Sequence, residues 1–121
     1  GHAVNTSDGD LWYVIEDFLN GTEVDGYMEI DQGAGMELGR LKARFGATHT
    51  FFGNLDCGNL LSFASPDEIC RATRACLEAG EGNGGHVLTA SNAITESVPV
   101  GNYLAMVNAY RDRFGLECCA I

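Results

Sequence analysis

Four short runs of apolar and β-branched residues recur along the chain, and each ends in small or polar residues. The runs lie within residues 2–8, 26–32, 48–56 and 85–92. Runs of this length that stop at glycine, serine, asparagine or aspartate are typical of buried strands. The pattern therefore predicts four strands, the first at about residues 2–6 and the second at about residues 26–30, each delivering polar groups at its carboxyl end.

A stretch with helical periodicity follows each predicted strand. The predicted helices carry apolar residues three and four positions apart and end near a glycine. The apolar positions of the first are Leu11, Val14, Ile15, Phe18 and Leu19, those of the second Met36, Leu41 and Phe45, those of the third Ile69, Ala72, Cys76 and Leu77, and those of the fourth Val100, Tyr103, Leu104, Val107, Tyr110 and Phe114. The third has the clearest start, since Ser65, Pro66 and Glu68 form the signature of a capping box with proline at the first helical position.

Four β-then-α units in succession predict right-handed crossovers and a parallel sheet with helices outside it. Their spacing fits half of a TIM (β/α)8 barrel or a small doubly wound sheet. Polar residues at every strand end favour the barrel, whose active sites lie there. The turn Gly33-Ala34-Gly35 is no dinucleotide fingerprint, because Leu38 stands where a third glycine is needed. We expect the C-terminal half of a TIM barrel, with residues 1–121 as a single partial domain.

Composition narrows the class of protein. The 121 residues are 45% hydrophobic and 20% charged, which is globular, and the formal net charge is -10. That charge repels phosphate backbones and anionic membranes, so neither nucleic acid nor a membrane is expected as a partner. No apolar run approaches the roughly 18 residues of a membrane span, and the first residues show neither the basic region nor the hydrophobic core of a signal peptide, so we expect a soluble, cytoplasmic protein.

The five cysteines do not form a recognisable framework. Their number is odd and no CxxC pair occurs, which argues against a secreted disulfide scaffold and a zinc ribbon. Cys70 and Cys76 fall in the third predicted helix, where we expect free thiols to pack as small hydrophobes. Cys57 lies just past the third strand and could enter a site.

Polar residues at the predicted strand ends are the candidate site. They are Ser7, Asp8, Asp31, Gln32, Asn54, Asp56, Ser91 and Asn92. Such a set suits hydrogen bonding of a polar small-molecule substrate or the holding of a hard cation through oxygens. The competing interpretation is structural: Asp8 and Asp10 can cap a helix, and Asn54 can shape a turn. The pattern identifies no catalytic residue.

Six blocks of the sequence carry a family resemblance. They are SDGDLW at residues 7–12, AGME at 34–37, LKARFG at 41–46, GNLD at 53–56, GGHVLTASN at 84–92 and PVGNYLAMV at 99–107. In this order and spacing they resemble the C-terminal part of the uroporphyrinogen decarboxylase superfamily. The resemblance implies a (β/α)8 barrel of which strands five to eight are present. It also adds His86 to the candidate substrate-binding residues, because a histidine next to a glycine occurs in the C-terminal part of the family.

The resemblance implies two chemistries. One is a cofactor-free decarboxylase, a lyase of tetrapyrrole (porphyrin) metabolism, or a divergent relative. The other is a methyltransferase that exchanges methyl groups with a corrinoid protein or a thiol, through zinc held by a His-x-Cys pair after strand five and a cysteine after strand eight. The matching places carry Asn5, Thr6 and Ser7, and Ser91 or Asn92, which are poor zinc ligands. We therefore expect no cofactor, disfavour zinc and favour the decarboxylase.

A small non-catalytic α/β binding or assembly module is the alternative of a different class. Four parallel strands alone would leave two open edges and an uncovered face. We expect such a chain to pair with the remainder of the barrel or to form a homodimer, and to be inactive in isolation.

Overall fold

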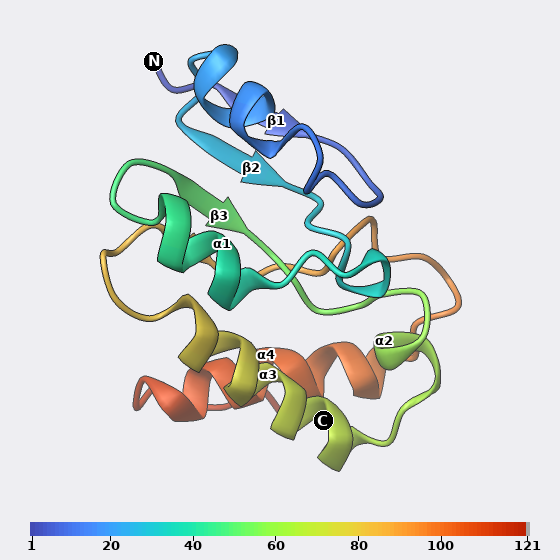
Figure 1. The fold of residues 1–121 in the computed structure, drawn as a ribbon. Coiled ribbons are helices and arrows are strands. Elements are labelled where there is room, and N and C mark those ends of the chain that lie inside the picture. Colours follow the sequence, from blue (N-terminus) through green and yellow to red (C-terminus); the bar gives the residue numbers. More distant parts are fainter. Residues whose placement is uncertain (121) are drawn as a thin grey trace.

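The computed structural model describes residues 1–120 and contains one sheet of four parallel strands. The strands are β1 (Val4–Thr6), β2 (Gly26–Met28), β3 (Thr50–Phe52) and β4 (His86–Val87), in the spatial order β1-β2-β3-β4 (Figure 1). The register aligns Asn5 with Tyr27, Tyr27 with Phe51, and Phe51 with His86. Sequential parallel neighbours are the arrangement of consecutive strands in a TIM barrel, so the predicted fold class is confirmed. The first two strands are shorter than predicted.

Helices connect the strands and cover one face of the sheet. In chain order they are the π-helix η1 (Asp17–Gly21), the 3-10 turn η2 (Gln32–Ala34), α1 (Leu38–Phe45), α2 (Leu60–Phe63), α3 (Pro66–Gly80) and α4 (Val100–Arg113). Helices α3 and α4 lie side by side, as Figure 1 shows in yellow-green and orange-red. No helix among residues 1–120 has the length and apolar character needed to cross a membrane.

The core lies between the sheet and these helices. Tyr27 and Phe51 point from neighbouring strands to the helix side and are 0% exposed. On the opposite face Val4, Met28 and Val87 are about 40% exposed, at 40%, 38% and 43%. Parallel sheets are normally covered on both faces, and in a barrel the second face is the filled interior. The open apolar face therefore corresponds to the interior of a barrel.

The first predicted helix forms only in part. Helical structure begins at residue 15 and continues as the π-helix η1, whereas the periodicity predicted a helix from Leu11. Asn5 Nδ2 and Thr22 Oγ1 both donate to the Phe18 carbonyl, at 3.0 and 2.7 Å, so side chains satisfy a group that a regular helix would pair along its backbone. The predicted cap also differs, because Asp10 accepts only the Trp12 N–H at 2.9 Å and forms a local turn.

The predicted start of α3 is confirmed. Ser65 Oγ accepts the Glu68 N–H at 3.4 Å, and the Glu68 carboxylate accepts the Ser65 N–H at 2.8 Å. The Glu68 carboxylate also accepts the Ser65 hydroxyl at 2.7 Å, and the hydrogen bonds that it accepts from the Ser65 N–H and hydroxyl lower the pKa of Glu68. At the other end of the fold Gly115, at φ +66°, lets the Leu116 N–H return to the Arg111 carbonyl at 2.8 Å and close α4.

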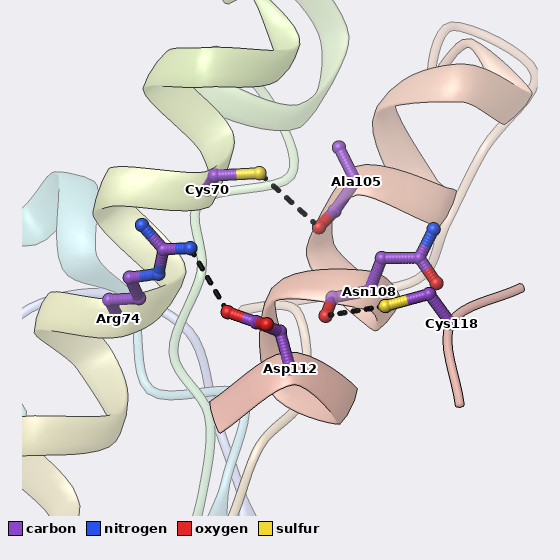
Figure 2. Close-up of polar contacts among 6 residues, drawn as sticks. All are labelled: Cys70, Arg74, Ala105, Asn108, Asp112 and Cys118. Carbon is purple, nitrogen blue, oxygen red and sulfur yellow. Dashed lines mark hydrogen bonds and ion pairs between the residues drawn. The ribbon is translucent and has the colours of Figure 1, made fainter. Parts of the chain in front are cut away.

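Polar contacts accompany the packing of α3 against α4 (Figure 2). Cys70 Sγ lies 3.7 Å from the Ala105 carbonyl oxygen, and Arg74 forms a 3.2 Å ion pair with Asp112. On the other side of α4 the tail returns and Cys118 Sγ lies 3.8 Å from the Asn108 carbonyl oxygen. Cys76 is buried in the core, as predicted for a thiol that packs as a hydrophobe, and Cys70 is half-buried.

Candidate functional site

A hydrogen bond between Asn92 and Asp8 joins loops that are distant in the sequence. Asn92 Nδ2 donates to Asp8 Oδ1 at 3.0 Å. Asp8 follows β1 and Asn92 lies beyond β4, the two edge strands of the sheet, yet the loops meet at the carboxyl ends of the strands (Figure 1). The sheet is therefore curved enough for its first and last loops to close one polar rim, which we call the mouth.

Asp31 fixes the shape of the mouth beside Asp8. Its Oδ2 accepts the Gly9 N–H and its Oδ1 accepts the Ala34 N–H, both at 3.1 Å. The first bond holds the loop after β1 against the end of β2, and the second caps η2. Both carboxylate oxygens thus have backbone partners, and Asp31 orders the rim.

Tyr27 lies beneath these two carboxylates. Its hydroxyl is 3.5 Å from the Ser7 carbonyl oxygen, and the Ser7 hydroxyl donates to the Asp8 carbonyl at 3.2 Å. Burial raises the pKa of Tyr27 above its ordinary value, and the charges of Asp31 and Asp8 raise it further. The phenol therefore stays protonated and acts as a donor under an acidic rim.

Asn54 and Asp56, at the end of β3, satisfy local backbone groups. Asn54 is 4% exposed and its Nδ2 donates to the Met36 carbonyl at 3.0 Å. Asp56 accepts the Gly58 N–H at 2.9 Å and the Asn59 N–H at 3.3 Å, which orders the turn before α2. The structure places both at the predicted end of the sheet, with these polar atoms engaged in shaping it.

Ser91 connects the loops after β3 and β4. It is buried, its Oγ accepts the Cys57 N–H at 3.3 Å, and it lies 3.7 Å from Cys57 Sγ. The Cys57 carbonyl in turn accepts the Ser62 hydroxyl at 2.8 Å. Cys57 therefore does reach a strand-end residue, although the contact is one of packing and hydrogen bonding between loops.

His86 lies apart from the mouth, at the start of β4 and on the helix side of the sheet. Its Nε2 pairs with the Gly53 carbonyl oxygen at 2.7 Å. Burial lowers the pKa of His86, the hydrogen bond to Gly53 opposes this, and the nearby ammonium of Lys42 adds to it. Lys42 is itself 4% exposed and donates to the Gly84 carbonyl. Burial lowers the pKa of Lys42 as well. Lys42 thus holds the glycine-rich turn before β4, and His86 joins the start of β4 to the end of β3.

Sequence reasoning missed Glu29. This residue lines a cavity of about 420 Å³ together with Asn92 at the mouth and Tyr103 of α4. Its φ of 61° is left-handed, an uncommon conformation for a residue with a side chain, and it ends β2 at Met28. The sequence pattern placed Glu29 inside a strand reaching residue 30. The one signal in the sequence for a site role of Glu29 was its alternation with Asp31 in an otherwise apolar run. Nothing in the pattern indicated that Tyr103 would line the same cavity.

The mouth offers carboxylates, amides and hydroxyls without a neighbouring cation. The lysine and arginine residues lie on α1, α3 and α4, and they are Arg40, Lys42, Arg44, Arg71, Arg74, Arg111 and Arg113. Across residues 1–120, no three histidine, cysteine or acidic side chains gather as a metal-binding group. The arrangement can accept hydrogen bonds from, and attract positive charge on, a polar small molecule.

Comparison with known proteins agrees with the fold. A search of curated proteins found no match. The family model described as "Uroporphyrinogen decarboxylase (URO-D)" matches residues 7–113, which include the polar residues that follow every strand and the whole of α4. The chain therefore belongs to the uroporphyrinogen decarboxylase (URO-D) family.

Proposed function

We propose that the chain supplies strands five to eight of the barrel of a uroporphyrinogen-decarboxylase-like enzyme, a cytoplasmic decarboxylase-type lyase of tetrapyrrole metabolism or a divergent relative. The observation that carries this proposal is the hydrogen bond between Asp8 and Asn92, because it closes a polar rim at the end of the sheet where barrel enzymes bind substrate. Ser7 and Asp31 complete the rim. The proposed ligand of this rim is a small molecule.

Because the rim formed by this chain is acidic, this chain and the remainder of the barrel must contribute different groups to the reaction. Loss of carbon dioxide leaves negative charge on the substrate, which cations or hydrogen-bond donors must stabilise. Asp8, Glu29 and Asp31 cannot do this as carboxylates. We infer that Asp8 and Glu29 accept hydrogen bonds from the substrate body while Asp31 orders the rim, and that the other strands supply the groups that bind the substrate's carboxylates.

Methyl transfer through a thiolate-bound zinc is the alternative within the same family. Zinc in such sites prefers cysteine and histidine ligands. The residues that end β1 and follow β4 are Thr6, Ser7, Ser91 and Asn92, which offer hydroxyl and amide groups. This donor set fits zinc poorly and supports the decarboxylase over the methyltransferase.

A product assay distinguishes the two reactions. The purified chain, assembled with the remainder of the barrel, is incubated with uroporphyrinogen, and the products are separated by their number of carboxyl groups. A second reaction offers methylcobalamin and a thiol. We expect stepwise decarboxylation, reduced at least about tenfold by Asn92→Asp, which places a second carboxylate against Asp8. Asn20→Asp, whose side chain contacts Glu16 far from the mouth, is the control. Methyl transfer without decarboxylation would contradict the proposal.

A further inference from the structure

The cavity that contains Glu29 differs in chemistry from the rest of the mouth. It lies between the ends of β2 and β4 and the side of α4, and its volume is about 420 Å³. Most of its lining is apolar, including Met28, Leu88, Ile94 and Met106. A volume of this order accommodates a small organic molecule.

Glu29 is the one charged residue in that lining. The four ion pairs formed within residues 1–120 use other carboxylates, those of Glu16, Asp25, Glu81 and Asp112. Two other polar residues in the lining already have protein partners. Thr89 donates to the Ala90 carbonyl at 3.0 Å, and Asn92 donates to Asp8 while accepting the Ala93 N–H at 2.7 Å. Glu29 is therefore the residue of this lining whose charge selects between positively and negatively charged ligands.

The apolar walls and the carboxylate together specify the ligand. A carboxylate at the edge of an apolar cavity repels anions and attracts a cation whose body can fill the remaining space. Tyr103, which is 40% exposed, adds an aromatic ring, a group that attracts organic cations. An adjoining cavity of about 350 Å³ shares Leu88, Tyr103 and Met106, so the apolar surface continues along α4.

We propose that this cavity is a subsite for an organic cation, a protonated or quaternary amine on an apolar body, with Glu29 as its counter-charge. The inference rests on the proposed function only in taking the mouth to be a ligand site. It adds to the mouth a place for a positively charged ligand on this wall of the barrel, while any carboxyl group to be lost faces the other wall.

Choline and its neutral isostere 3,3-dimethylbutan-1-ol test the charge requirement at constant shape. Titration calorimetry of the purified protein is expected to show choline binding at least about tenfold more tightly than the alcohol. Glu29→Gln keeps the length of the side chain and should abolish this preference by weakening choline alone. Glu23→Gln is the matched control, because Glu23 also has a left-handed φ, of 55°, and does not line the cavity.

Several results would overturn the proposal: equal binding of the two molecules, no binding of either, or a choline affinity that Glu29→Gln leaves intact. Far-ultraviolet circular dichroism of Glu29→Gln verifies the fold, and Tyr103→Phe, which retains the ring, should preserve choline binding.

The outcome of the choline titration is independent of the product assay. Choline binding without decarboxylation would remove the proposed reaction and keep the subsite, and the reverse would remove the subsite alone.

Discussion

At the scale of single residues, the contact between Gly80 and His86 shows how closely the helices approach the sheet. Gly80 ends α3, and a Cβ atom built on it would overlap Nδ1 and Cγ of the His86 ring. The ring is held by its bond to the Gly53 carbonyl, so it has little freedom to move aside. The position therefore requires glycine for reasons of space.

We predict that Gly80→Ala lowers the free energy of unfolding by about 1–3 kcal/mol, the usual cost of overpacking. Urea denaturation measures the effect. Gly101→Ala provides the control, since a Cβ at Gly101 in α4 meets nothing within 4 Å and should leave stability unchanged or raise it by up to about 1 kcal/mol. Equal effects of the two substitutions would contradict the close contact with His86.

At the scale of elements, α3 depends on its amino-terminal cap. Ser65→Ala removes the acceptor for the Glu68 N–H and the donor to the Glu68 carboxylate. We predict a loss of about 1 kcal/mol in the free energy of unfolding, the typical cost of removing a cap. Thermal or urea unfolding provides the measurement. Ser65→Thr keeps the hydroxyl and should retain most of the stability; a loss as large as that of Ser65→Ala would mean that the capping box is unimportant.

The elements also show where sequence patterns suffice. The start of α3 was predicted correctly because Ser65, Pro66 and Glu68 act on one another within a single turn. The first helix departs from the prediction at its carboxyl end too, where Asn5 of β1 donates to the Phe18 carbonyl, a contact between two elements, and the helix takes the π form of η1. Local sequence signals predict a helix terminus correctly when residues close in the sequence form its hydrogen bonds. They fail where a side chain distant in the sequence hydrogen-bonds to a backbone group of the helix.

At the scale of the whole molecule, the uncovered interior face and the two edge strands have the largest consequences. Val87 lies on β4 and is 43% exposed on that face. Parallel edges with exposed apolar side chains pair readily with other strands. We predict that the chain alone self-associates, unless the remainder of a barrel is present.

Light scattering during size-exclusion chromatography tests this prediction with Val87→Lys. A charge on the edge strand opposes strand pairing, so this substitution should weaken self-association at least about tenfold. Val100→Lys is the control, because Val100 begins α4 outside the sheet and is 74% exposed. A chain that is monomeric before any substitution would contradict open-edged pairing.

The candidate site was only partly accessible from sequence. The end-of-strand rule located Asp8, Asp31, Ser91 and Asn92 at the mouth, since parallel strands carry their carboxyl ends to one side of a sheet. It could not foresee that Asp31 and Asp56 would have both oxygens occupied by backbone groups. It also placed Glu29 within a strand, because a left-handed φ at a non-glycine residue leaves no mark in a hydrophobic pattern.

Hydrophobic periodicity, capping residues and strand-end polarity are local and repeat in order along the chain, so they were enough to predict the four parallel βα units and the family. The contacts between distant residues came from the folded chain alone: Asn92 reaches Asp8, His86 packs against Gly80, and Glu29 lines an apolar cavity with Tyr103. The physical reason is that sheet curvature and backbone conformation at single residues set these distances, and neither is encoded in the spacing of residue types.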